Sequence, residues 1–175
     1  IIPTPNLVLL AGAPKLGKSW FAFLLIEQLT KTGYKVVYLA NEDSDQRLQT
    51  RYNQVTDYPS NDVVFFGALS NDKKIPKGKD AHLFLREIKK KFNPKVIIVD
   101  TMAAIRSLNE RENYGSVEQE FATLRHMAHD IDIVIICVHH TKKKTDYDVE
   151  PLDSILGSQA IAGTAETILI MQSIV

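Results

Sequence analysis

Apolar runs of strand length recur along the chain and are separated by segments with a helical pattern. The runs cover residues 7–11, 35–40, 63–67, 95–100, 131–138 and 167–171. Most are apolar almost throughout and do not alternate between apolar and polar residues, which is typical of parallel strands buried on both faces. Strands of this kind that alternate with helices predict an α/β domain with a mostly parallel central sheet and helices on both faces.

Helical signals fill the intervals between these runs. A first helix is predicted to begin in the loop at residues 12–19 and to reach about Lys31. Ser44 is predicted to cap a second helix, and Asp80 a third, because their side-chain oxygens can accept hydrogen bonds from the first backbone N–H groups. Apolar residues at a helical spacing indicate a fourth helix at positions 117, 121, 124 and 127.

The composition is that of one folded domain. Of 175 residues, 45% are hydrophobic and 24% are charged, which argues against disorder. The 21 basic and 21 acidic residues balance, so a nucleic-acid partner must be inferred from local patches and not from the overall charge. The chain lacks an initiator methionine and stops inside an apolar run, so we expect residues 1–175 to be one domain that is trimmed at its C-terminus.

The cellular setting is predicted from the cysteine content and from the longest apolar stretches. Cys137 is the single cysteine and lies within an apolar run, so we expect a buried thiol and a reducing compartment. Charged residues interrupt every apolar run before it reaches the length that crosses a bilayer. A cytoplasmic protein with no membrane contact is therefore expected.

The clearest chemical motif joins the first predicted strand to the first helix. It fits the pattern G-x-x-x-x-G-K-[ST] and consists of Gly12, Ala13, Pro14, Lys15, Leu16, Gly17, Lys18 and Ser19. Glycines let the backbone approach phosphate groups, and the helix N-terminus offers them N–H groups. Lys18 is predicted to contact the β- and γ-phosphates of ATP, and the Ser19 hydroxyl to bind Mg²⁺. With the adjoining Trp20, this segment is the predicted nucleotide site; the alternative is a plain glycine turn.

Carboxylates follow two strands whose carboxyl ends are expected at the same sheet edge as this loop. Asp100 closes the run at residues 95–100 and is the predicted second metal ligand. Glu42 follows the run at residues 35–40 and is the predicted catalytic base that polarises the attacking water. Asp43 competes with Glu42 for this role. Each of these carboxylates has the alternative of capping the helix that follows it.

A histidine pair ends the fifth predicted strand. His139 and His140 follow the run at residues 131–138 and are expected at the same ligand-binding edge. His140 is the predicted catalytic sensor of the γ-phosphate. The alternatives are structural histidines or a zinc site, and the neighbouring sequence does not supply the further ligands that zinc needs.

Three segments in this order resemble RecA-like ATPases, and among them the hexameric replicative helicases of the plasmid RepA type. The segments are residues 11–23, residues 39–44 with the following Arg47-Leu48, and His139-His140-Thr141-Lys142 with the later stretch 157–163. The resemblance implies a RecA-like P-loop NTPase fold in which the sensor strand lies between the phosphate-loop strand and the strand of the Walker B aspartate. It also implies the same site residues: Lys18 and Ser19 on Mg-ATP, Glu42 as catalytic glutamate, Asp100 as Walker B aspartate and His140 as sensor.

The same resemblance implies partners. Proteins of this family form homo-oligomeric rings with ATP between subunits, and loops that face the pore hold single-stranded DNA. The corresponding loops here contain Arg106, Arg111 and the run Lys142, Lys143 and Lys144. Their charges can neutralise DNA phosphates, but a lysine run is also typical of a solvated loop. The arginine finger of the family is expected beyond Val175.

Together these features predict an ATP-hydrolysing RecA-like motor domain, which is a DNA helicase or a DNA-dependent ATPase of replication or repair. The alternatives are a RecA-like ATPase that acts on protein partners without unwinding, a small-molecule kinase, and a nucleotide sensor without turnover. Kinases usually carry an arginine-rich lid, and the sequence shows no such cluster, so hydrolysis is favoured over transfer to an acceptor. The complete set of predicted catalytic residues argues against a sensor without turnover.

Overall fold

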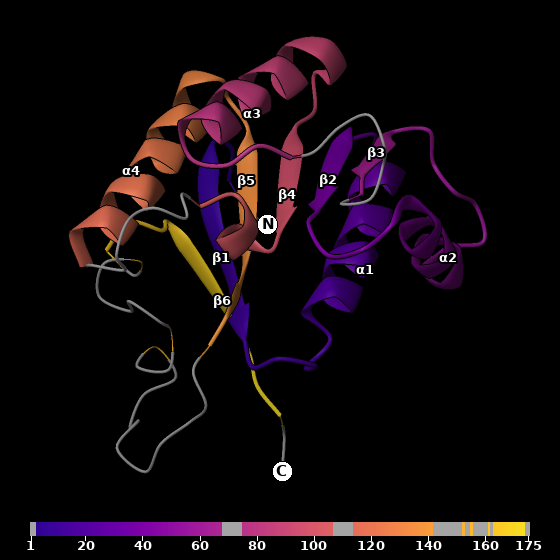
Figure 1. The fold of residues 1–175 in the computed structure, drawn as a ribbon. Coiled ribbons are helices and arrows are strands. Elements are labelled where there is room, and N and C mark those ends of the chain that lie inside the picture. Colours follow the sequence, from indigo (N-terminus) through magenta and orange to yellow (C-terminus); the bar gives the residue numbers. More distant parts are fainter. Residues whose placement is uncertain are drawn as a thin grey trace.

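Six strands form one sheet between two layers of helices in the computed structural model of the chain (Figure 1). The structure describes residues 3–67, 75–106, 114–141, 152, 155, 161 and 163–173. In chain order the elements are β1 (Asn6–Gly12), α1 (Lys18–Lys31), β2 (Val36–Ala40), α2 (Asp45–Val55), β3 (Val63–Phe66), α3 (Lys79–Phe92), β4 (Val96–Asp100), the 3₁₀-helix η1 (Met102–Ala104), α4 (Tyr114–Asp130), β5 (Val134–His140) and β6 (Thr167–Met171). Each predicted strand and each predicted helix is present.

The strands lie in the order β3-β2-β4-β5-β1-β6, and all of these pairings are parallel. β5 therefore lies between β1, which leads into the phosphate loop, and β4, which ends in Asp100. This is the position that the family resemblance implies for the sensor strand. Because the strands are parallel, the segments that follow β1, β2, β4 and β5 meet at one edge of the sheet.

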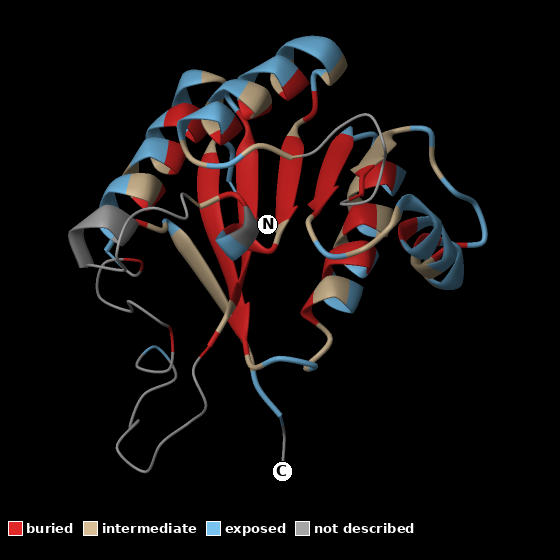
Figure 2. Cartoon of the chain, in the orientation of Figure 1, coloured by how far each residue is buried: buried red, intermediate tan, exposed pale blue. Residues whose placement is uncertain are grey.

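Alternate residues of the strands build two cores, one on each face of the sheet. On β1, Leu7 and Leu9 face the layer of α3 and α4, whereas Val8 and Leu10 face the layer of α1 and α2. Figure 2 shows the central strands buried along their length and the exposed residues on the outer sides of the helices. Each large apolar side chain buried completely in this way contributes roughly 1.5–3 kcal/mol. Burial on both faces therefore fixes the sheet from which the loops extend.

Two helix starts test the predicted caps. Ser44 Oγ accepts a hydrogen bond of 3.3 Å from the backbone N–H of Arg47 at the start of α2, as predicted. The prediction for Asp80 is wrong, because Gly78 is the N-cap of α3 and its carbonyl accepts a hydrogen bond of 3.1 Å from the N–H of Ala81. Asp80 lies instead in the first turn, where its negative charge stabilises the helix N-terminus.

The strand β5 begins three residues later than its apolar run suggested. Ile131 and Ile133 belong to the turn that ends α4, because their N–H groups donate to the carbonyls of Met127 and Ala128. Residues of this turn contact the same core as the strand, so the apolar pattern runs through both. Cys137 within β5 is buried as expected, and burial raises the pKa of its thiol to about 12.

Candidate active site

The phosphate loop connects β1 to α1 at the carboxyl edge of the sheet (Figure 1). β1 is an interior strand held by β5 on one side and β6 on the other, so the start of the loop has a fixed position. Gly17 is the N-cap of α1 with φ 87° and ψ 19°, the left-handed conformation that favours glycine. The loop thereby directs the first N–H groups of α1 toward the space beyond the strands, which suits an anion.

Lys18 begins α1 and folds back over the loop. Its Nζ donates hydrogen bonds of 2.8 Å to the carbonyls of Gly12 and of Ala13, and the residue is only 4% exposed. An ammonium group has three N–H donors, of which these carbonyls use two. Burial lowers the pKa of Lys18, and the nearby Asp100 carboxylate opposes that shift. The positive charge is therefore held at one place in the site.

Asp100 ends β4 beside the loop. Its Oδ2 accepts a hydrogen bond of 2.5 Å from the hydroxyl of Tyr38, which lies on the neighbouring strand β2. Burial, and after it the charge of Asp100, raise the pKa of the Tyr38 phenol well above its ordinary value, so the phenol is a hydrogen-bond donor at neutral pH. The predicted metal ligand Asp100 is therefore held by a buried tyrosine of the neighbouring strand.

Glu42 and Asp43 follow β2 but have different surroundings. Asp43 forms an ion pair of 3.3 Å with Arg47 and a second ion pair with Arg51. Glu42 is exposed and lines the same cavity as Lys18. The structure thus gives Asp43 a structural role at the start of α2, and the role of Glu42 as catalytic base stays a prediction.

His140 reaches the site from β5. The strand register pairs it with Gly12, the last residue of β1. Its Nδ1 is buried and has no hydrogen-bond partner among the residues that the structure describes. A buried polar atom in this state is costly unless water or a ligand meets it. This placement suits the predicted sensor, whose role stays a prediction.

A cavity of about 250 Å³ brings the predicted residues together. Its lining includes every residue to which catalysis or metal binding was assigned, and it comprises Lys15, Gly17, Lys18, Ser19, Trp20, Glu42, Arg51, Asp100, Thr101 and His140. Four members of the predicted nucleotide segment do not line it, namely Gly12, Ala13, Pro14 and Leu16. Two of these four shape the site indirectly, because their carbonyls hold the Lys18 ammonium.

Arg51 and Thr101 line the cavity without having been predicted. Arg51 comes from α2, and its guanidinium is positioned by the ion pair with Asp43. No local motif marks Arg51, because its place depends on how α2 packs against the sheet. Thr101 is buried and directly follows Asp100, so its adjacency to a predicted metal ligand was the available signal.

The residues predicted to contact DNA lie mostly outside the described part of the chain. This applies to Arg111, Lys142, Lys143 and Lys144. Arg106 is described, and its Nε donates a hydrogen bond of 2.9 Å to Glu120 on α4. Arg106 therefore has a structural contact that the sequence did not reveal.

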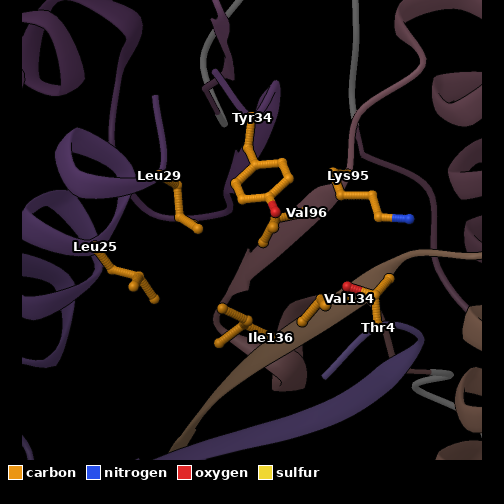
Figure 3. A pocket seen from close by; sticks show the side chains of 8 residues that line it. All are labelled: Thr4, Leu25, Leu29, Tyr34, Lys95, Val96, Val134 and Ile136. Carbon is orange, nitrogen blue, oxygen red and sulfur yellow. The ribbon is translucent and has the colours of Figure 1, made fainter. Parts of the chain in front are cut away.

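A second cavity, of about 330 Å³, lies at the opposite edge of the sheet, where the strands begin (Figure 3). Leu25 and Leu29 of α1 face the starts of β4 and β5 across this cavity, and the ring of Tyr34 extends into it. Its walls are mainly apolar, and none of the predicted catalytic residues contributes to them. Phosphate chemistry is therefore assigned to the cavity at the carboxyl edge alone.

The described residues limit the metal chemistry of the site. They contain no group of three or more His, Cys, Asp or Glu side chains that could hold a metal ion. A structural zinc site needs about four such ligands, whereas magnesium in a nucleotide complex needs one or two because phosphates and water complete its shell. Across the same residues, no helix has both the length and the apolar character required to cross a membrane.

Comparison with known proteins finds relatives with a repair function in their names. A family model described as AAA domain matches residues 1–146. The DNA repair protein RadA of Chlamydia muridarum (strain MoPn / Nigg) is 28% identical over 144 residues, which are 79% of this chain and 28% of the relative. The DNA repair protein RadA of Listeria monocytogenes serovar 1/2a (strain ATCC BAA-679 / EGD-e) is 27% identical over 142 residues, with the same two shares. The chain thus spans little more than a quarter of these curated relatives.

A solved structure of another protein's ATPase domain shares the fold. It matches with a TM-score of 0.71 at 16% sequence identity, over 97% of this chain and 70% of that one. At this level of identity the match concerns the arrangement of the sheet and helices, and it extends over nearly the whole chain.

Proposed function

Because the chain belongs to the AAA domain family, we propose that it is an ATP-hydrolysing, RecA-like motor domain that works on DNA. The activity is that of a DNA helicase or a DNA-dependent ATPase in replication or repair. One observation carries the proposal: Lys18, Ser19, Glu42, Asp100 and His140 come from separate parts of the fold and line a single cavity. Phosphoryl transfer to water requires this combination of phosphate-binding, metal-binding and water-orienting groups.

The donor set of this cavity fits a magnesium nucleotide. Mg²⁺ prefers oxygen ligands and is bound by few protein groups together with phosphates. The Ser19 hydroxyl and the Asp100 carboxylate supply such oxygens, and both residues line the same cavity. When bound, Mg²⁺ neutralises charge that develops on the phosphates. Lys18 and the N–H groups of the loop contribute further positive potential on the side of the β- and γ-phosphates.

The hydrolytic step needs a base and a contact to the γ-phosphate. In the proposed reaction the Glu42 carboxylate accepts a proton from water as the water oxygen bonds to the γ-phosphorus. The bond between that phosphorus and the β–γ bridging oxygen breaks, and ADP and phosphate leave. The His140 ring donates a hydrogen bond to the γ-phosphate and so links its presence to the end of β5.

Assembly into a homo-oligomeric ring with single-stranded DNA in its pore belongs to the same proposal. Trp20, Phe21 and Leu24 are exposed large apolar side chains on α1 beside the cavity, which supports burial of this face by a second copy of the chain. DNA as the substrate is supported by the relatives that are named DNA repair protein. The DNA contacts are proposed at Arg111, Lys142, Lys143 and Lys144, and the setting is the cytoplasm, where ATP and DNA are both available to such a motor.

The test is steady-state ATP hydrolysis with and without single-stranded DNA, with Lys18→Ala as the blank. Stimulation by DNA supports a DNA-dependent motor, and a strand-displacement assay then separates a helicase from an ATPase that does not unwind. A rate that ignores DNA points to an ATPase that acts on protein partners. Phosphate that appears on a small acceptor instead of in water contradicts the proposal and identifies a kinase.

A further inference from the structure

Tyr38 is a buried tyrosine whose hydroxyl contacts a predicted metal ligand, Asp100. The residue is 0% exposed and sits in the middle of β2, so it has no direct access to solvent. Its hydroxyl donates to Asp100 Oδ2 at 2.5 Å. Asp100 ends the neighbouring strand β4, so a side chain from inside one strand holds the carboxylate at the end of the next.

The direction of this hydrogen bond follows from the donors and acceptors present. A phenol has one O–H donor, and Tyr38 uses it on Asp100. An Asp100 carboxylate that accepts at Oδ2 keeps Oδ1 for a cation.

The ring of Tyr38 is held by aromatic neighbours. Phe23 of α1 stacks on it with 5.2 Å between ring centroids, and Phe65 of β3 meets it edge-on at 5.9 Å. Phe23 lies one helical turn after Ser19, so the helix that carries one predicted metal ligand packs on the tyrosine that contacts the other, Asp100. These contacts fix the hydroxyl and leave it little freedom to follow a ligand that moves.

We propose that Tyr38 is a positioning residue for Mg²⁺, which orients the Asp100 carboxylate so that its second oxygen is directed toward the cation. The inference rests on the proposed binding of a magnesium nucleotide in this cavity. Tyr38 is placed to act on the cation only through Asp100. Loss of the hydroxyl therefore weakens the response to magnesium and leaves binding of the metal-free nucleotide intact.

Tyr38→Phe is the direct test, because it removes the hydroxyl and keeps the ring that packs on Phe23 and Phe65. Tyr52→Phe is the matched control. Tyr52 is a second buried tyrosine of the same core that also contacts Phe65, but its hydroxyl accepts from the N–H of Ser60, away from the cavity. Both variants lose one hydroxyl from the same core, and only the hydroxyl of Tyr38 contacts a predicted metal ligand.

Trp20 provides the readout. It is the single tryptophan of the chain and lines the cavity, so its fluorescence reports ADP binding without turnover. ADP is titrated first in EDTA and then at a series of Mg²⁺ concentrations. For Tyr38→Phe we expect an ADP affinity in EDTA equal to that of the wild type and a half-saturating Mg²⁺ concentration raised by about 10-fold or more, the usual effect of losing a partner of a metal ligand. Tyr52→Phe is expected to match the wild type in both conditions.

Three outcomes separate the inference from the proposed function. A Tyr38→Phe protein with the magnesium dependence of the wild type overturns the inference alone. If the ADP affinity of the wild-type protein does not depend on the Mg²⁺ concentration, the proposed metal site itself is overturned. A general structural defect is recognised by weaker ADP binding in EDTA, and this too contradicts a role through the metal ligand. In an Asp100→Ala background the effect of Tyr38→Phe on the magnesium dependence is expected to shrink, because the carboxylate that Tyr38 orients is already gone.

Discussion

Two loop carbonyls hold the Lys18 ammonium, so its positive charge has a fixed position in the cavity. For Lys18→Ala we expect loss of nucleotide binding by at least about tenfold, because a buried charge-assisted contact to phosphate is worth roughly 1.5–3 kcal/mol. Trp20 fluorescence with ADP measures this change. Lys31→Ala is the control on the same helix, since its exposed ammonium pairs with Glu27 at the far end of α1. Unchanged affinity in Lys18→Ala would refute the nucleotide site.

The two neighbouring carboxylates after β2 are expected to respond in opposite ways. Glu42→Gln keeps the shape of the side chain but cannot accept a proton, so we expect normal nucleotide binding and loss of turnover. Asp43→Asn weakens the ion pairs with Arg47 and Arg51, so we expect a destabilisation of about 1–3 kcal/mol with turnover retained. ATPase assays and urea denaturation of both variants check this. Turnover retained in Glu42→Gln would contradict the role of Glu42 as catalytic base. Turnover lost in Asp43→Asn alone would assign the role of base to Asp43.

A site residue can be predicted from the sequence when its neighbours along the chain form a recognisable motif with it. Lys18 and Ser19 belong to a continuous motif, so their neighbours in the chain identify them. Tyr38 looks like any aromatic residue of a buried strand, because its bond to Asp100 spans 62 positions. Arg51 could not be predicted from the sequence either, since only the packing of α2 brings it to the cavity. Contacts between elements therefore had to come from the structure.

At the scale of elements, the contact between β3 and α2 is unusually close. The N–H of Gly67, just after β3, donates to Asp45 Oδ1 at 2.8 Å, and a Cβ on Gly67 would overlap that oxygen. The backbone nitrogen of Asp45 would be 2.8 Å from the same Cβ, so a change of side-chain rotamer cannot relieve the clash. For Gly67→Ala we expect a destabilisation of about 1–3 kcal/mol from overpacking.

Thermal and urea denaturation of Gly67→Ala measure this cost. Asp45→Ala is the companion variant, because it removes the hydrogen bond without adding an atom and should cost only about 1 kcal/mol. Gly67→Ala at wild-type stability would mean that the segment after β3 moves away from α2 freely. ADP binding at low temperature should be preserved in both variants, since neither residue lines the cavity.

Element boundaries show where apolar patterning stops being informative. The order and parallel direction of the strands agree with the expectation from fully apolar runs, because such runs have few other ways to be buried. The start of β5 was misplaced because Ile131 and Ile133 are apolar in a turn as well as in a strand. The start of α3 was misplaced because its N-cap is Gly78. Gly78 caps the helix through its backbone and has no side chain that would mark it in the sequence as a cap.

At the scale of the whole molecule, the proposed ring predicts that activity depends on protein concentration. If a neighbouring subunit completes each site with an arginine finger, turnover per chain should rise by roughly 10³-fold or more between the monomer and the assembled ring. ATPase rates over a concentration series, with the mass of the assembly measured by sedimentation at each point, check this. A constant rate per chain across assembly would mean that each cavity works alone.

Substitution of Leu24 by Asp on the exposed apolar face of α1 should move the transition from monomer to ring to a higher protein concentration.

The order of the strands also has a consequence for synthesis on the ribosome. β1 emerges before every other strand, yet its two neighbours in the sheet, β5 and β6, emerge last of the six. The roughly 120 residues between β1 and β5 take on the order of ten seconds to translate at typical speeds. During that time this strand, which is apolar after Asn6, has two unpaired edges, and unpaired edges are templates for aggregation. A nascent chain that stalls before residue 134 therefore has no way to anchor its phosphate loop, however complete the loop's own sequence is.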